Sequence, residues 1–290
     1  TLFPYTTRRG EVVRTEFDAR GRLTRRDFPD SGFERWAYDE LGRPVRAANE
    51  HGEVTAERDA RGHATLSTDS DGRSTRYVVD DGGRVTRRTT GDGFVTEYEW
   101  DAAGRLLSVK DGGGRPWVAY EWDGAGRLAR ESKGNGTATV WSYLPEGRVG
   151  SVVNYGSGGQ VLSSFAYTYD PDGNPIALTT PEGTTVFGYD AAGQLVAVLR
   201  PDGRQVRIEY DRNGNRTRVV DASTSEDWTA NGLNQVTSAG DARFEYDEAG
   251  NLVKRTDASG ATTFDWNADG RMVRVVHPVH GTFEYDYDAL

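Results

Sequence analysis

Aromatic residues recur at every second position in short stretches of this chain. Phe165, Tyr167 and Tyr169 alternate with small or polar residues, and the same spacing returns at Phe283 and Tyr285. Successive side chains of a β-strand point to opposite faces, so period two places these rings on one face of a sheet. The pattern predicts short strands, with rings from neighbouring hairpins stacked in ladders across the sheet.

A turn motif follows these stretches at a spacing of about 21 residues. It reads aromatic-Asp-x-x-Gly-Arg-aliphatic, and residues 100–106 (WDAAGRL) are a full copy. Asp can accept backbone N–H bonds in a turn, and Gly can take the left-handed conformation that closes a hairpin. A second glycine follows about ten residues later, as Gly114 follows Gly104, and predicts the opposite turn. Other copies begin at Phe17, Tyr38, Trp122, Tyr169, Tyr189, Tyr210, Tyr246 and Trp266, and degenerate copies at Arg58, Val79, Tyr143 and Trp228.

The repeats predict an all-β fold of tandem antiparallel β-hairpins. We expect one array over residues 1–290, with repeats from about residue 11 and a last repeat truncated at 290. About 27 strands at ~4.8 Å each would extend on the order of 130 Å. Twisted sheets rarely exceed ~10 strands without curling. The expected architecture is therefore a curved, spiralling open sheet, a wall around a space and part of a longer shell.

A seven-bladed β-propeller is the alternative fold. A blade needs four strands in ~40–45 residues, so seven blades would fit this length. The copies recur without visible pairing into doublets, however, and this favours the open sheet.

Composition narrows the classes of function. The chain has 290 residues, a net charge of −10, no cysteine and a mean hydropathy of −0.70. An acidic chain without a basic cluster does not favour nucleic acid or an anionic membrane surface. No stretch approaches 18 apolar residues, so we expect no membrane insertion by this segment. The start of the sequence does not resemble a signal peptide, and we expect the chain to be a piece of a longer protein.

The repeated Tyr-Asp-x-x-Gly-Arg-Leu unit resembles the YD repeat of the Rhs family. That family includes bacterial Rhs and wall-associated polymorphic toxins, the C subunits of insecticidal Tc complexes, and the teneurin YD shell. The resemblance extends from about residue 17 to 290 and includes the variant Asn-Gly-Leu-Asn-Gln at 231–235. It implies a β-sheet cocoon, which in bacterial members encloses a C-terminal toxin, and a secreted or cell-surface location.

The sequence departs from full-length members of that family. A whole cocoon is much longer, and no toxin domain is present. Residues 170–173 (Asp-Pro-Asp-Gly) match once a string that is paired in members with self-cleavage, and we interpret them as an ordinary turn. This segment is therefore expected to contribute only the wall.

No constellation of residues predicts catalysis, a cofactor or a metal. His277 and His280 could form a metal pair, but an i, i+3 spacing in a strand would place the rings on opposite faces, and this segment lies at a turn. His51 and His63 lie near turn glycines and are expected on the surface. Asp170 lies in a loop that lacks the Gly and Glu positions of a calcium-binding loop. We predict that this segment is not an enzyme.

Two functions follow from these expectations. The first is a structural shell segment that encloses or presents a C-terminal toxin or effector, with that cargo and the rest of the shell as partners. The second is an extracellular surface for carbohydrate or protein binding and adhesion, because aromatic rows could stack on glycans. Packing of the rings within the wall is the competing interpretation of the same rows.

Overall fold

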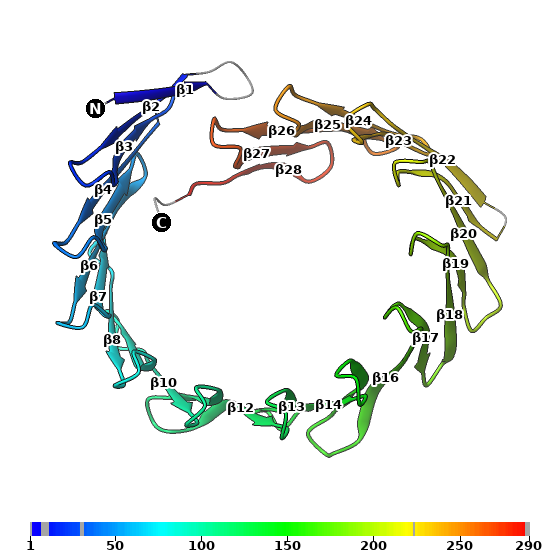
Figure 1. The fold of residues 1–290 in the computed structure, drawn as a ribbon, viewed down its shortest axis with the longest axis horizontal. Helices are drawn as coiled ribbons and strands as arrows, with labels where there is room; N and C mark the ends of the chain where they lie inside the picture. The colour runs from blue at the N-terminus through cyan, green and yellow to red at the C-terminus, as the bar shows by residue number, and fades with distance from the viewer. Residues whose placement is uncertain (1, 7–11, 30–31, 223, 288–290) are drawn as a thin grey trace. The chain divides into compact units, whose positions relative to one another are not determined.

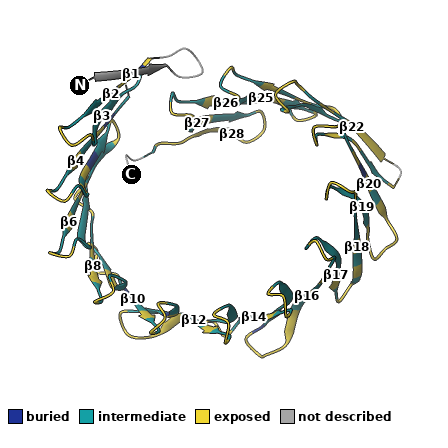
Figure 2. Ribbon diagram, in the orientation of Figure 1, coloured by how far each residue is buried: buried dark blue, intermediate teal, exposed yellow. Residues whose placement is uncertain are grey.

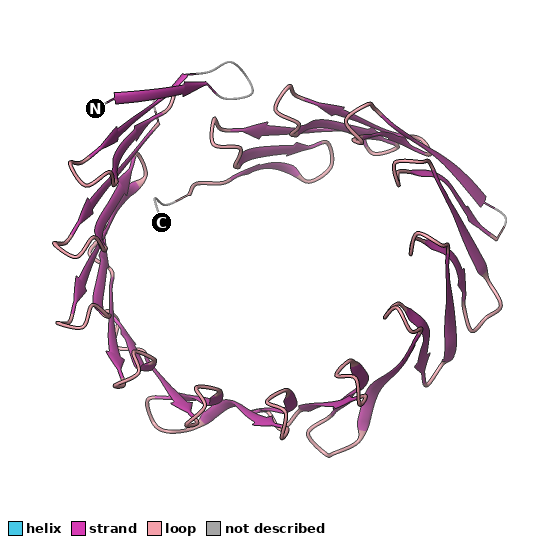
Figure 3. Cartoon of the chain, viewed as in Figure 1, coloured by secondary structure: helices cyan, strands magenta, loops and turns pink. Residues whose placement is uncertain are grey.

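A computed structural model describes residues 2–6, 12–29, 32–222 and 224–287, and within these it contains 28 strands (Figure 3). Alternation of aromatic or β-branched residues with polar ones, and a glycine turn at each end, account for the short strands. Two compact units divide the chain, residues 95–230 in one and residues 1–94 with 231–290 in the other. Each unit is described separately below.

The unit of residues 95–230 holds thirteen consecutive strands that follow one another along an arc (Figure 1). Each strand pairs antiparallel with the next one in sequence. The strands are β10 (Val95–Trp100), β11 (Leu106–Asp111), β12 (Pro116–Trp122), β13 (Leu128–Lys133), β14 (Ala138–Tyr143), β15 (Val149–Tyr155), β16 (Val161–Tyr169), β17 (Pro175–Thr180), β18 (Gly183–Tyr189), β19 (Leu195–Leu199), β20 (Gln205–Tyr210), β21 (Arg216–Asp221) and β22 (Thr224–Ala230).

The other unit repeats this meander in two stretches. Its first stretch runs from β1 to β9 and its second from β23 to β28, again with sequential antiparallel pairing. The strands are β1 (Leu2–Thr6), β2 (Val12–Phe17), β3 (Leu23–Asp27), β4 (Phe33–Tyr38), β5 (Pro44–Asn49), β6 (Gly52–Arg58), β7 (Ala64–Asp69), β8 (Ser74–Val79), β9 (Val85–Thr90), β23 (Val236–Ala239), β24 (Ala242–Tyr246), β25 (Leu252–Asp257), β26 (Gly260–Trp266), β27 (Met272–His277) and β28 (Gly281–Glu284).

This pairing confirms the all-β fold of tandem hairpins in an open, curved sheet and shows that the propeller alternative is wrong. Thirteen strands pair in one continuous series in residues 95–230, where a propeller would group them into blades of four. The single array over residues 1–290 and its spiral course stay predictions.

Burial in the sheet is shallow, and in some strands it is one-sided. In β20, Val206, Ile208 and Tyr210 are buried or half-buried, whereas Arg207 and Glu209 between them are exposed. Figure 2 shows the turns mostly exposed and the strands mostly intermediate. The buried residues in the described chain are Val13, Thr15, Glu34, Ala47, Thr96, Ala138, Ser108, Gly156, Ile208 and Thr262. Five of these ten are polar or charged, so no thick apolar core forms and the contacts at the turns matter more.

Candidate functional site

The Asp-x-x-Gly turns share one hydrogen-bond arrangement, which Asp18 illustrates. Its Oδ1 accepts the backbone N–H groups of Arg20 at 2.9 Å and Arg22 at 3.0 Å, and its Oδ2 accepts Nε of Arg22 at 2.6 Å. Gly21 closes the turn with φ +78°, and its N–H donates to the Asp18 carbonyl. The Arg22 backbone N–H is the largest influence that holds the pKa of Asp18 below its ordinary value. The ionised carboxylate is therefore part of the turn.

In most repeats an aromatic residue ties its own turn to the preceding one. The hydroxyl of Tyr38 donates a hydrogen bond to the carbonyl oxygen of Leu23, which directly follows the preceding turn, at 2.7 Å. Trp122 does the same through Nε1 to the Leu106 carbonyl at 2.9 Å. The other bonds of this kind are Tyr143 to Leu128, Tyr169 to Val149, Tyr189 to Pro175, Tyr210 to Leu195, Tyr246 to Val236, Trp266 to Leu252 and Tyr287 to Met272.

The turn arginine completes the link. The guanidinium carbon of Arg22 lies 4.8 Å from the ring centroid of Tyr38, and its Nη1 donates to the carbonyl of Asp39 at 3.0 Å. Turn arginines stack in the same way on Trp122, Tyr143, Tyr169 and Tyr287. Arg216, the first residue of β21 after its turn, stacks on Trp228. We call this series of aspartate, arginine and aromatic contacts the turn ladder. It revises the predicted ladder of rings, because arginines bridge one turn to the next ring. The stacked pair Tyr167–Tyr169 lies within one strand.

Degenerate repeats keep the turn and lose single contacts. Leu144 replaces the aspartate, yet its backbone N–H still donates to the Arg148 carbonyl at 2.8 Å. His63 replaces the arginine and contacts Asp59 through Nδ1 at 3.1 Å. The copy predicted to begin at Trp228 is shifted, because its turn is Asn231–Gln235 with Asn234 at φ +61°. Ala230, not Trp228, therefore occupies the position before the turn.

Two segments that the sequence analysis considered for metal binding, the Asp170 loop and the His277–His280 pair, differ in structure. The Asp170 turn is closed by its own carboxylate, which accepts the N–H of Gly173 and of Asn174 at 2.8 Å, as an ordinary turn would be. His277 and His280 lie at a turn, as the sequence indicated, and their ring centroids are 4.5 Å apart instead of on opposite faces as in a strand. The backbone N–H of His280 donates a hydrogen bond to Nδ1 of His277, so this ring nitrogen is already engaged within the turn. No group of three or more potential ligands gathers in the part of the chain that the structure describes.

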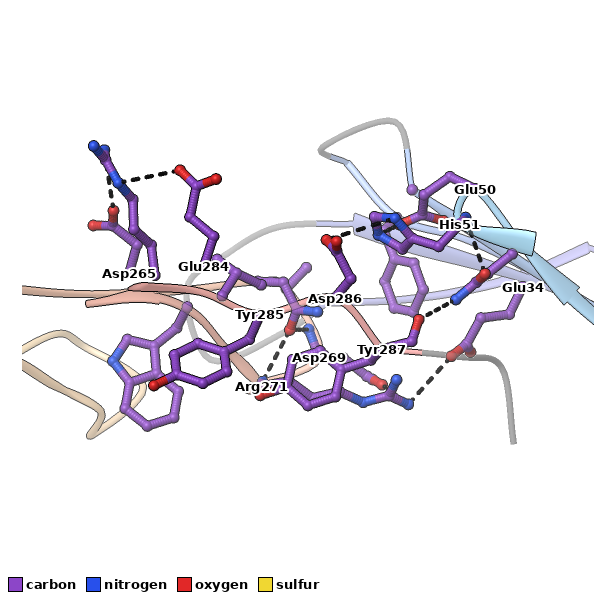
Figure 4. A pocket seen from close by; sticks show the side chains of 18 of the residues that line it. Glu34, Glu50, His51, Asp265, Asp269, Arg271, Glu284, Tyr285, Asp286 and Tyr287 are labelled. Carbon is purple, nitrogen blue, oxygen red and sulfur yellow. Dashed lines mark hydrogen bonds and ion pairs between the residues drawn. The ribbon is translucent and has the colours of Figure 1, made fainter. Parts of the chain in front are cut away.

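A cleft of about 550 Å³ lies in the unit that holds both ends of the described chain (Figure 4). One side comes from the turns around β4 and β5, with Glu34 and His51, and the other from β26 to β28, with Arg271. Contacts across it join residues more than 200 positions apart: Nη2 of Arg271 lies 3.3 Å from Oε1 of Glu34. Asn49 donates to the Tyr287 carbonyl at 2.6 Å. Turns of distant repeats therefore meet side by side.

Glu34 is the most buried charge of this cleft, with 6% of its side chain exposed. Burial raises the pKa of Glu34, and Arg26 at 3.1 Å and Arg271 oppose the shift by stabilising the charged form. Asp269 pairs with both arginines and raises the pKa of Glu34. His51 Nδ1 lies 3.6 Å from Asp286 Oδ1 across the cleft. His51 is exposed in a turn, as the sequence predicted. These contacts hold the β4–β5 region and the β26–β28 region together. None of the residues in them is a nucleophile beside a positioned base.

Comparison with known protein families agrees with the repeats. The Teneurin YD-shell model matches residues 184–290, and the RHS Repeat model matches residues 79–116. Among curated proteins, the double-stranded DNA deaminase toxin A of Burkholderia cenocepacia is 27% identical over 277 residues, which is 82% of this chain and 18% of that protein. The probable deoxyribonuclease RhsB of Dickeya dadantii is 27% identical over 216 residues, 74% of this chain and 14% of that protein. The chain thus spans less than a fifth of either relative. The expected resemblance to Rhs/YD-repeat proteins is confirmed.

Solved structures show the same fold. The crystal structure of TcdB2-TccC3 aligns with 99% of this chain and 20% of its own, with a TM-score of 0.73 and 17% identity. The Tc holotoxin pore of Photorhabdus luminescens aligns with 95% of this chain and 18% of its own, with a TM-score of 0.71 and 17% identity. Among the described residues, no helix is long and apolar enough to cross a membrane.

Proposed function

We propose that this array of Rhs/YD repeats is a structural wall segment of a shell that encloses a toxin or effector polypeptide. The segment acts by its shape and its stability, and catalysis belongs to other parts of the protein. The partners are the enclosed polypeptide and the rest of the shell, and the protein is secreted or lies at the cell surface.

The turn ladder is the observation that carries this proposal. Its aspartates, arginines and aromatic side chains are used to join one hairpin to the next. Such a ladder stabilises a sheet of any length from nearest-neighbour contacts, as in other repeat proteins. Because few residues of the sheet are buried, its second face does not need a layer of side chains packed against it. Such a sheet is suited to surround a space.

Limited proteolysis in urea tests enclosure. In the full-length protein that contains this array, the cargo region should resist protease until the urea concentration at which the array unfolds. Circular dichroism follows that unfolding in the same samples. Cleavage of the cargo region at urea concentrations well below the array transition would contradict enclosure, because an enclosed chain is reached only after its wall opens.

A further inference from the structure

A second cleft, with a volume of about 740 Å³, lies within the unit of residues 95–230. It is formed by the turn between β11 and β12 and the turn between β13 and β14, both at the edge opposite the turn ladder. Trp117, Tyr120 and Arg115 line it, together with the Glu131–Lys133 pair. The wall function uses none of these residues in the turn ladder.

The backbone holds these two turns together. The N–H of Gly134 donates to the Trp117 carbonyl at 2.7 Å. A Cβ at Gly134 would meet the Pro116 carbonyl oxygen at 2.4 Å, so only glycine allows this approach. The β11–β12 register shifts between Val109, which pairs with Val118, and Lys110, which pairs with Pro116. Trp117 is the extra residue of this bulge and is 38% exposed.

Arg115 differs from the other arginines of its motif. The sequence contains seven Asp-x-x-Gly-Arg turns, and in six of them the arginine side chain pairs with the turn aspartate. In the seventh, Arg115 uses only its backbone N–H for Asp111. Its guanidinium makes no ion pair with any described residue and is exposed beside Trp117. The cleft therefore holds a cation whose usual partner does not engage it.

Polar groups complete the cleft. Tyr120 faces Glu131 across the β12–β13 pair, and its hydroxyl has no hydrogen-bond partner among the described residues. Lys133 Nζ lies 3.4 Å from Glu131 Oε1, so these two charges largely neutralise each other. Asp111 also lines the cleft, but its Oδ1 accepts the backbone N–H groups of Gly113 and Arg115 within the turn. Donors and acceptors thus surround an exposed indole, and the Arg115 guanidinium is the cation left to bind an anion. An aromatic platform with a few placed polar groups is typical of ligand sites.

We propose that this cleft binds an acidic sugar, with the pyranose ring on the Trp117 indole and the sugar carboxylate on the Arg115 guanidinium. The electron-rich ring face attracts the C–H groups of a pyranose. A guanidinium matches a carboxylate with two parallel N–H···O bonds. Tyr120 and Lys133 donate to the ring hydroxyls. The wall segment would then bind acidic polysaccharide at the same time as it performs its structural role.

Calorimetric titration of the 290-residue chain with hexagalacturonate tests this site, with the neutral maltohexaose as the matched probe. We expect hexagalacturonate to bind about tenfold or more tightly than maltohexaose, and added salt to weaken the binding. Trp117→Ala and Arg115→Gln should each weaken it about tenfold or more. Two controls should bind as the unchanged chain does: Phe94→Ala, at another exposed aromatic after a turn, and Arg73→Gln, at an arginine paired with its aspartate.

Several results would overturn the proposal. They are no binding of hexagalacturonate at millimolar concentration, equal binding of both probes, unchanged binding by Trp117→Ala or Arg115→Gln, or an equal loss in the two controls. Circular dichroism of each variant checks that the sheet is retained. Because the proteolysis experiment above does not involve this cleft, the two proposals can fail separately.

Discussion

The hydroxyl of Tyr143 lies 2.8 Å from the carbonyl oxygen of Leu128 and donates a hydrogen bond to it, while Arg127 lies on the face of the same ring. One side chain thus satisfies a backbone carbonyl of the previous hairpin and forms a platform for the previous turn's arginine. In the full motif Asp shapes its own turn, and the aromatic residue joins that turn to the one before; Tyr143 keeps this second role although Leu144 replaces the aspartate of its own turn.

Removal of this hydroxyl should destabilise the sheet modestly. Tyr143→Phe leaves the ring for Arg127 but removes the side-chain donor that the Leu128 carbonyl has in the structure. We expect a loss of about 1 kcal/mol in the free energy of unfolding, measured by urea titration. Tyr98→Phe is the matched control, because no described residue accepts a bond from the Tyr98 hydroxyl. Equal effects of the two variants would show that the hydrogen bond contributes nothing.

Two glycines of one turn should respond differently to alanine. Gly126 has φ +79°, which costs an L-residue about 1 kcal/mol or more. Gly124 is two residues earlier, has no positive φ, and a Cβ added to it would meet only open space. Gly126→Ala should therefore lower the free energy of unfolding, and Gly124→Ala should leave it unchanged or raise it slightly. Thermal and urea unfolding of both variants measure this difference, and a reversed order would refute the turn geometry.

Acid should weaken the turn ladder through its aspartates. The Arg127 backbone N–H and side chain hold the pKa of Asp123 below its ordinary value. A carboxyl whose pKa is lower in the folded state stabilises the fold above its unfolded pKa of about 3.9, and that stability is lost as the pH falls through the folded pKa. Asn267 shows that an amide can cap the same turn. Asp123→Asn should thus be less stable than the unchanged chain at neutral pH, and the difference should shrink in acid.

Urea unfolding of both proteins at neutral pH and at about pH 3 measures that difference. A gap that stays constant between the two pH values would mean that the charge of Asp123 is unimportant to the turn.

The contribution of Glu34 to the free energy of unfolding should depend on pH in the opposite direction to that of Asp123. Its pKa is raised by burial, so protonation favours the folded state, and this contribution grows as the pH falls through the folded pKa. Arg271→Ala removes one of the two arginines that stabilise the charged form. We expect the pKa of Glu34 to rise further and the free energy of unfolding at neutral pH to fall by about 1–3 kcal/mol. Carbon-detected NMR titration measures the pKa, and an unchanged value would show that the contact does not persist in solution.

The local features of the fold could be predicted from the sequence. The aspartate and glycine of each turn have a conformational role that acts within five residues, so residues 170–174 were correctly interpreted as a turn. Period two likewise assigned Ile208 and Tyr210 to the same, more buried face. These features depend on backbone geometry close to each residue, and that geometry is encoded locally.

Features that depend on the neighbouring repeat could not be predicted in the same way. The motif contains both an arginine and an aromatic residue, but the spacing does not reveal that Arg22 would lie between its own turn and Tyr38. The contact of Glu34 with Arg271 joins residues 237 positions apart, and no local pattern encodes it. The spacing also does not reveal that the Arg115 side chain would leave Asp111, because the same register shift precedes turns in which the pair forms. The sequence motif of that turn is identical to those in which the pair forms.

Electron cryo-microscopy of the full-length protein tests the central claim most directly. If this segment is a wall around cargo, the reconstruction will show the strands of residues 12–287 in a curved sheet with polypeptide density enclosed on one side. A reconstruction in which the space bounded by this sheet holds solvent alone, with the toxin or effector region outside it, would contradict the account.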